Sequence, residues 1–393
     1  MISDETLKLL VRLINLCRSS GAIPYSWDAK NHRFYFTNQS LRKTRRWLGA
    51  QLLILLYVVV RTIFVKFQSH DNNFASFNFC LSIVFALMLQ SLVRAPPAFF
   101  PKKFVCLINS GLRFTQGYQA NWYPNLDLST SKWNIFTIFF FKTCSVSTFL
   151  GFLSTTWLYF VFPNMPPFPG DLFPPQNYYY YLCYLVVGLF YPCYLFMVWS
   201  TLLFGACITL VFIAGLIPIL TCDFRGDRAP PTGQNIEELR HVENFTRFYR
   251  QVELIHKLFL ENYAIILIPI QSLVGQYGLI CNYSLISQWD GMDGATKVFL
   301  LAQFVAIQVA WYLFLTLSGW FHDNSVKVIK SWKDLRVRNE WEGKLIGKFR
   351  KSCKPMYIGY PGVFRIRYVT VLKHFQGLTR GTFRMLIALK KTK

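Results

Sequence analysis

The residue types that carry out catalysis are present in this chain, but their spacing matches no catalytic site. The six histidines form neither an HExxH nor an HxxHH box, no serine stands in a GxSxG turn, and no acidic pair lies within an apolar run. The ten cysteines are scattered, with no CxxC pair and no metal-ligand spacing. We therefore expect no catalytic residue, no metal site, no bound cofactor and no enzyme activity.

Three polar side chains inside apolar runs are candidates for contact with a solute. Lys142, Gln271 and Gln276 lie within runs long enough to cross a bilayer, where an unpaired polar group is costly. A secondary transporter of a small solute is therefore one alternative. Transporters usually contain an internal repeat with paired broken helices, and this sequence shows no such repeat. For Lys142, a side chain that reaches the lipid headgroups is the simpler explanation.

The composition is typical of a protein with many membrane-spanning helices. Of the 393 residues, 53% are hydrophobic, 18% are aromatic and only 16% are charged, against roughly 25% charged in soluble domains. The formal net charge of +23 is concentrated between the apolar runs. That distribution indicates membrane orientation rather than nucleic-acid binding. We expect an all-α polytopic membrane protein with no nucleic-acid partner.

Six apolar runs and one weaker, basic segment indicate seven crossings. The runs cover residues 48–67, 74–93, 133–162, 178–220, 262–289 and 298–321, and the weaker segment covers 363–389. The fourth run is long enough for two crossings, but it contains no polar turn, and a turn inside the bilayer would leave backbone groups unpaired. We therefore expect one helix there, whose last turns project beyond the membrane and pack on protein.

The distribution of positive charge predicts the orientation. If the fourth run crosses once, 29 Lys and Arg residues lie on one side of the membrane, in the segments 1–46, 94–132, 223–251 and 323–360. The positive-inside rule then places these segments and the amino terminus in the cytosol, and the carboxyl terminus outside. Charged and apolar residues at helical spacing also predict that several membrane helices continue into the cytosol as a small bundle.

The carboxyl-terminal part of the chain resembles the arthropod chemoreceptor superfamily of odorant and gustatory receptors. The segment KFRKSCKPMYIGYPGVFRIRYVTVLKHF is similar to the family's lead into its last helix, with matches at Ser352, Lys354, Pro355, Gly362, Phe364 and Thr370. A weaker match is GAIPYSWDAKNHRF, ahead of the first apolar run. The chain departs from the gustatory pattern at Val371, where that pattern has tyrosine, and at Gln376, which comes one position early.

The resemblance implies a plasma-membrane receptor that acts as a ligand-gated, non-selective cation channel for a small organic tastant or odorant. It implies a homo- or hetero-tetramer with related subunits, surrounded by membrane lipid, in which the seventh helix lines a central pore. The chain would divide into a cytosolic segment with an amphipathic helix (1–46), helices one to six (47–322), a cytosolic helical anchor loop (323–361) and the pore helix with a short outer tail (362–393). Helices four to six would extend into the cytosolic anchor bundle.

In this orientation, the resemblance places the ligand in the outer half of the helices. The candidate ligand-binding residues are mostly aromatic with two amides: Phe152, Trp157, Tyr159, Tyr184, Tyr191, Gln303, Phe304 and Gln308. Such a lining suits a small, mostly apolar organic molecule. The alternative for each aromatic residue is an interfacial anchor or core packing.

The last segment supplies the candidate pore residues, which are Gln376, Arg380, Thr382 and Leu386, with the leucine as a candidate hydrophobic gate. Lys373 and Arg384 make the segment unusually basic, so the alternative is a helix that lies along the membrane surface. The sequon at Asn282 falls at an outer helix end and predicts N-glycosylation there.

Overall fold

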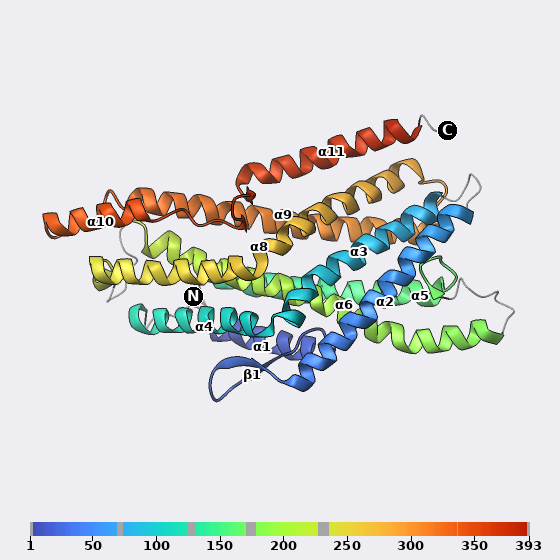
Figure 1. Ribbon diagram of the computed structural model, residues 1–393, viewed down its shortest axis with the longest axis horizontal. Helices are drawn as coiled ribbons and strands as arrows, with labels where there is room; N and C mark the ends of the chain where they lie inside the picture. The colour runs from blue at the N-terminus through green and yellow to red at the C-terminus, as the bar shows by residue number, and fades with distance from the viewer. Residues whose placement is uncertain are drawn as a thin grey trace.

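The protein is mostly helical throughout the residues that the computed structural model describes. These are residues 3–68, 74–123, 131–169, 178–226, 236–335 and 337–390. Strands occur in this part of the chain only as two short hairpins. Figure 1 shows long helices that run roughly along the longest axis, with the last helix, α11, at one edge. The all-α architecture expected from the composition is confirmed.

The amino-terminal segment begins with an amphipathic helix, α1 (Asp4–Ser19). The hydroxyl of Ser3 accepts a hydrogen bond from the Thr6 amide, and acidic residues in the first turn favour this end of the helix dipole. The apolar face of α1 is buried against α5 (Lys132–Val161) and α6 (Tyr178–Pro218). The segment is therefore packed against the long helices.

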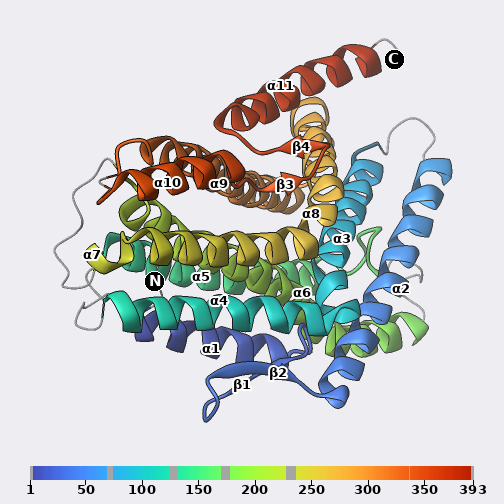
Figure 2. The same ribbon diagram turned by 60° about the vertical axis from the view of Figure 1, so that its left-hand side comes forward.

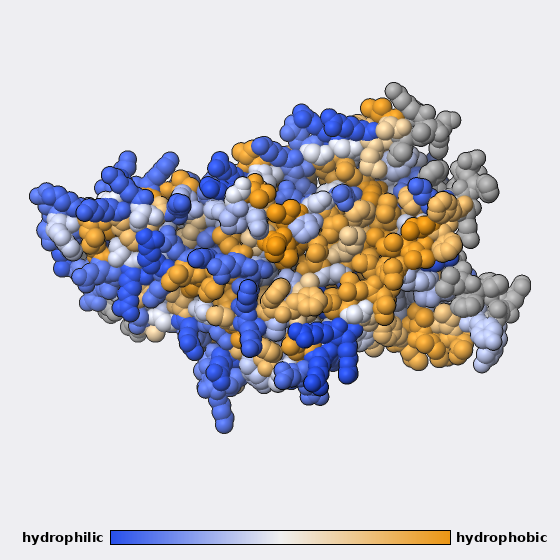
Figure 3. All heavy atoms as spheres, in the orientation of Figure 1, coloured by the Kyte–Doolittle hydropathy of each residue, from blue (hydrophilic) through white to orange (hydrophobic). Residues whose placement is uncertain are grey.

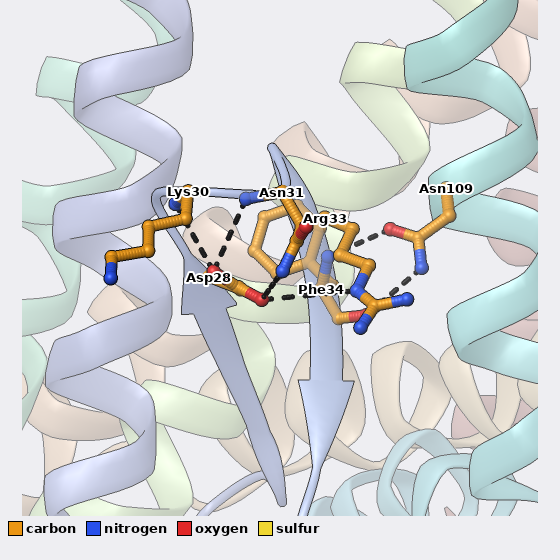
Figure 4. Close-up of polar contacts among 6 residues, drawn as sticks. All are labelled: Asp28, Lys30, Asn31, Arg33, Phe34 and Asn109. Atoms are coloured by element: carbon orange, nitrogen blue, oxygen red, sulfur yellow. Dashed lines mark hydrogen bonds and ion pairs between the residues drawn. The ribbon is translucent and has the colours of Figure 1, made fainter.

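A hairpin that the sequence analysis did not anticipate follows α1. Strands β1 (Tyr25–Asp28) and β2 (Arg33–Phe36) pair antiparallel. In Figure 4 the carboxylate of Asp28 accepts hydrogen bonds from the backbone N–H groups of Lys30 and Asn31 and from the Asn31 side chain. Hydrogen bonds from Asn31 lower the pKa of Asp28, so this carboxylate is ionised and holds the turn at neutral pH.

Helix α4 (Pro101–Trp122) was also missed, because residues 94–132 were expected to form a cytosolic loop. It follows directly on α3 (Phe74–Phe99) and buries an apolar face at helical spacing. The side chain of Asn109 in α4 pairs with the backbone N–H and C=O of Phe34 at 2.8 and 2.9 Å (Figure 4), which ties the hairpin to this helix.

In the described part of the chain, six helices are long and apolar enough to cross a bilayer, and they correspond to the six expected apolar runs. Their candidate spans are Asn38–Phe67, Ala75–Phe99, Lys132–Val161, Tyr178–Gly205, Val242–Ser287 and Gly294–Ser331. The first belongs to α2 (Asn38–Gln68). Figure 3 shows hydrophobic surface concentrated toward one end of the molecule and hydrophilic surface at the other. This separation is typical of a membrane domain joined to a domain in water.

Helix α6 is continuous over 41 residues, as the absence of a polar turn predicted. It ends in a π-helical turn, η3 (Ile219–Asp223), and the short helix α7 (Ile236–Leu239) comes later in the chain. Leu216 and Ile217 at the end of α6, and Ile219 and Leu220 in η3, are at most 3% exposed. The surplus apolar turns therefore pack on protein, as expected.

Helices α8 (Val242–Ser287) and α9 (Gly294–Ser331) are also much longer than one bilayer thickness. At 46 and 38 residues they extend over about 69 and 57 Å. Their hydrophilic ends pack with α4, η3 and α10 (Glu340–Ser352) around a shared core. In that core the ring of Trp332 lies edge-on to Tyr249, with 4.7 Å between centroids. This bundle is the part of the protein that we expected in the cytosol.

Helix α11 (Tyr368–Lys390) follows a small hairpin of β3 (Gly359–Tyr360) and β4 (Phe364–Arg365). It packs against α8 and α9 and lies at the edge of the molecule in Figures 1 and 2. At 23 residues it is about 35 Å long, which is sufficient to cross a bilayer. Helix α11 is not one of the six candidate spans named above, because it is too basic and too polar overall.

A fully buried arginine joins the amino-terminal segment to the long helices. Arg94 of α3 is 0% exposed. Its guanidinium donates hydrogen bonds to the backbone oxygens of Gly21 and Thr44 at 2.8 and 3.1 Å and to the side chain of Gln51 at 3.4 Å. It also contacts the sulfur of Met197 in α6. One side chain of α3 therefore connects the turn after α1 to α2 and α6.

Candidate functional site

Aromatic side chains gather where α8 ends and α9 begins. They come from α3, α5, α6, α8, α9 and the segment after α5, and they form a core separate from that of the hydrophilic bundle. We call this group the aromatic cluster; its members used below are Tyr159, Phe168, Tyr184, Tyr191, Tyr277 and Phe304, together with the buried Cys281. A buried, largely apolar group with a few hydroxyls is suited to a small organic molecule.

Tyr159 lies at the centre of the aromatic cluster and is 1% exposed. Its ring centroid is 4.9 Å from that of Tyr191, 5.3 Å from Phe168 and 5.9 Å from Tyr184. Its hydroxyl donates to the backbone oxygen of Tyr184 at 3.2 Å. The rings fill the space between α5 and α6, so a ligand would replace some of these contacts.

Half of the sequence-predicted ligand residues fall within this cluster. Tyr159, Tyr184, Tyr191 and Phe304 belong to it. Phe152 packs instead on Phe196, 5.6 Å away, beside a different core. Trp157 is 56% exposed on the outer surface of α5. Gln303 is half-buried on α9.

The remaining predicted ligand residue, Gln308, lies at the junction of three helices. It is 6% exposed, and its amide nitrogen donates to the backbone oxygen of Val274 in α8 at 3.3 Å. Its carbonyl oxygen is 3.1 Å from Nε2 of His374 in α11. A β-carbon at Gly278 would lie 2.7 Å from the Gln308 nitrogen, so the three helices meet closely here. Gln308 thus connects α9 to α8 and to the last helix.

A second polar contact joins α8 to α11 nearer their ends. The Asn282 side-chain nitrogen donates to the Thr382 hydroxyl at 3.0 Å, and Thr382 is 7% exposed. The predicted pore residue Thr382 therefore faces α8 in a single subunit. The predicted glycosylation acceptor Asn282 is half-buried, with its amide engaged in this contact. Glycosylation at Asn282 stays a prediction.

The other predicted pore residues lie away from the side of α11 that packs on α8 and α9. Gln376 and Arg380 are exposed and Leu386 is half-buried. Lys373, Gln376, Arg380 and Arg384 follow one another at spacings of three or four residues, which places them on one stripe of the helix. A second exposed stripe is apolar and includes Leu372, Phe375, Phe383 and Ile387. Helix α11 therefore has one packed, one polar and one apolar side.

Sequence reasoning missed Gly319, where α9 meets the start of α11. A β-carbon there would lie 2.8 Å from the backbone nitrogen of Tyr368 and 2.9 Å from the backbone carbon of Arg367. Only glycine allows this close approach of two backbones. An isolated glycine within a helical pattern was the one available signal.

It also missed a buried carboxylate in the hydrophilic bundle. Asp223 of η3 is 1% exposed and accepts hydrogen bonds from the hydroxyls of Tyr118, at 2.7 Å, and Tyr123, at 2.5 Å. Burial raises the pKa of Asp223 to about 6, against the opposing effect of both tyrosine hydroxyls. The contact joins the end of α6 to the end of α4.

The raised pKa of Asp223 predicts a pH-dependent stability. Asp223 binds its proton more tightly in the folded protein than in the unfolded chain, where its pKa is about 3.8. The stabilisation that results is fully present below pH 3.8 and is lost as the pH rises through about 6. When the pH is lowered from 7.5 to 5.5, we expect the free energy of unfolding to rise by about 1 kcal/mol. The Asp223→Asn variant should not show this rise. Apparent Tm values of both proteins in detergent at the two pH values measure it. Equal pH slopes for the two proteins would contradict the assignment.

Similarity to known proteins was found at the level of structure and extends over nearly the whole chain. No family model and no curated protein matches the sequence. Among solved structures, the olfactory receptor OR5 of the insect Machilis hrabei is similar, with a TM-score of 0.69 and 11% sequence identity, when bound to eugenol. A second structure of the same receptor gives a TM-score of 0.69 and 10% identity. Both matches cover 97% of this chain and 98% of the other. The chain therefore has the fold of an insect olfactory receptor.

Proposed function

We propose that this protein is a chemosensory receptor of the insect odorant and gustatory superfamily and acts as one subunit of a ligand-gated, non-selective cation channel. The observation that carries the proposal is the shared fold, which extends over nearly the whole of both chains. The motif before the last helix, KSCKPMYIGYPGVF, supports it independently. In this proposal the protein lies in the plasma membrane, with the amino terminus in the cytosol.

The three sides of α11 support a role for this helix in a pore. The polar stripe would be costly against lipid, whereas it is stable against water. The apolar stripe requires a further protein or lipid surface, because Leu372 is 72% exposed in the single chain. A ring of four subunits, with α11 nearest the axis, would cover the apolar stripes and direct Gln376 and Arg380 to a central channel.

Helix α8 connects the proposed ligand site to the proposed pore helix. Tyr277 and Cys281 belong to the aromatic cluster, whereas Gly278 and Asn282, one position later in each case, contact α11. Displacement of the aromatic rings by a ligand would therefore press on the helix that holds α11. On α9, Phe304 belongs to the aromatic cluster, and Gln308, about one turn later, contacts His374 of α11.

We propose that the ligand is a small, mostly apolar organic molecule held in the aromatic cluster, and eugenol, found in the similar receptor, is a reasonable first compound to test. Tyr159→Ala removes the central ring, so we expect a change of at least tenfold in the half-maximal concentration of any activating compound, because a ring contact contributes about 1 kcal/mol beyond the area it buries. Whole-cell current, normalised to surface protein, measures it with and without a co-expressed related subunit.

Phe139→Ala provides the matched control, because Phe139 lies on the same helix and is 67% exposed. This variant should change the half-maximal concentration by less than twofold. Equal effects of the two substitutions would contradict a ligand site in the aromatic cluster. If cells that express the protein take up the compound but show no current, the transporter alternative would be favoured.

A further inference from the structure

Basic residues crowd the first turns of α2, immediately before the part of the helix that faces lipid. Arg42, Lys43, Arg45 and Arg46 are all exposed. About one and a half turns further on, Leu52 begins a row of exposed apolar side chains that continues to the end of the helix. The four cations therefore lie at the level where the hydrocarbon of the membrane gives way to headgroups.

The corner between α3 and α4 forms the second side of this surface. Phe99 and Phe100 are 56% and 58% exposed, and Lys102 and Lys103 beside them are exposed as well. Arg45 holds the two sides together, since its Nε donates to the backbone oxygen of Ala98 at 3.1 Å. The terminal nitrogens of its guanidinium are left to serve as donors to another group. We call Arg42, Arg45, Arg46, Phe99, Phe100, Lys102 and Lys103 the basic shelf.

No carboxylate of the described residues neutralises the basic shelf. Residues 38–123 contain one acidic residue, Asp71, which lies outside the described residues. Within the described ranges, none of the shelf's cations makes an ion pair with a carboxylate. The nearby hairpin carboxylate, Asp28, already lies 3.8 Å from Arg33. Among the residues that the structure describes, the five positive charges of the shelf therefore have no carboxylate partner.

The start of α2, which carries part of the basic shelf, lies on the opposite side of the molecule from the proposed pore helix. Figure 2 shows α11 at the upper edge of the molecule, whereas the start of α2 and the β1–β2 hairpin lie at the lower edge. Figure 3 shows hydrophilic atoms below the apolar surface in the region where α2 begins. In the proposed ring of subunits this surface would meet the surrounding bilayer.

We propose that the basic shelf binds the headgroup of an anionic phospholipid of the inner leaflet. The phosphate and carboxylate oxygens would accept hydrogen bonds from Arg42, Arg45 and Arg46 on one side and from Lys102 and Lys103 on the other. Phe99 and Phe100 would contact the glycerol and the first acyl carbons, where aromatic rings are favoured. Clusters of Lys and Arg next to a membrane helix attract anionic lipids. The proposed orientation supplies only the choice of leaflet.

Native mass spectrometry of the full chain in detergent micelles tests this site. The probes are dioctanoyl phosphatidylserine, dioctanoyl phosphatidylcholine and inorganic phosphate, each titrated separately. The test variant carries R42Q, R46Q, K102Q and K103Q and keeps Arg45, which bonds to the backbone. The control variant carries K333Q, K344Q, K348Q and K351Q, which remove the same charge from the hydrophilic bundle.

We expect the unmodified protein to bind phosphatidylserine at least tenfold more tightly than phosphatidylcholine, and the shelf variant to lose that preference. The control variant should keep it within twofold, and so should R42K/R46K, which preserves both charges and guards against misfolding of the larger variant. Equal binding of the two lipids by the unmodified protein would overturn the proposal. So would an equal loss in the control variant, or full competition by millimolar inorganic phosphate, which would indicate a site for the free anion.

Discussion

Replacing Gly319 with valine should abolish ligand-gated current while most of the protein still reaches the cell surface. The substitution introduces a side chain where the backbones of α9 and α11 approach so closely that even a β-carbon would lie 2.8 Å from the nitrogen of Tyr368. Backbone atoms cannot move aside as a flexible side chain can, so the start of α11 must shift. Overpacking of this kind costs on the order of 2 to 3 kcal/mol.

The measurement is current per surface receptor, with surface protein quantified by biotin labelling of intact cells. Gly377→Val on α11 is the control, because a β-carbon at Gly377 meets nothing within 4 Å in the described structure. The control should retain at least half of the current. A Gly319→Val channel with unchanged current would show that the position of α11 does not govern gating.

Arg94→Ala should cause the largest loss of stability among the changes considered. The substitution leaves the backbone oxygens of Gly21 and Thr44 and the amide of Gln51 without their donor, and it opens a cavity at the contact with Met197. An unpaired buried acceptor costs about 1 to 3 kcal/mol, and the cavity adds to this. We expect a total loss of about 3 to 5 kcal/mol.

Thermal unfolding in detergent, followed by intrinsic fluorescence, measures the effect of Arg94→Ala, and limited proteolysis locates it. Because Arg94 binds the turn after α1, we expect the amino-terminal segment to become susceptible to protease first. Arg113→Ala is the control: it removes an exposed arginine from α4 and should change the stability by less than 0.5 kcal/mol, as exposed substitutions usually do. Equal Tm values for the two variants would contradict the role assigned to Arg94.

The long helices could be predicted from the sequence because hydropathy and turn chemistry are local properties. The absence of a polar turn between 178 and 220 was sufficient to predict the single helix α6. Helix α4 differs, because its sequence mixes polar and apolar residues. Only the helical spacing of its apolar residues indicates a helix. Charge counting treated its segment as a loop and missed the helical spacing of Phe104, Leu107 and Ile108.

The candidate site was harder to predict because it depends on which helices are neighbours. An amide such as Gln308 within an apolar run requires a hydrogen-bond partner, but nothing local in the sequence identifies His374 as that partner. Phe152 and Tyr159 are equally aromatic and lie two turns apart on α5, yet they belong to different cores. Gly319 is another such case, because its requirement for glycine arises from α11, about 50 residues later in the chain.

The proposed pore requires α11 to cross the membrane, and epitope labelling of intact cells tests this most directly. One tag follows Lys393 and another is inserted after Val337, between α9 and α10, each in an otherwise unmodified chain. We predict that antibody reaches the first tag in intact cells and the second only after permeabilisation. Labelling of both tags on the same side of the membrane would show that α11 does not cross it, and the proposed pore would then be wrong.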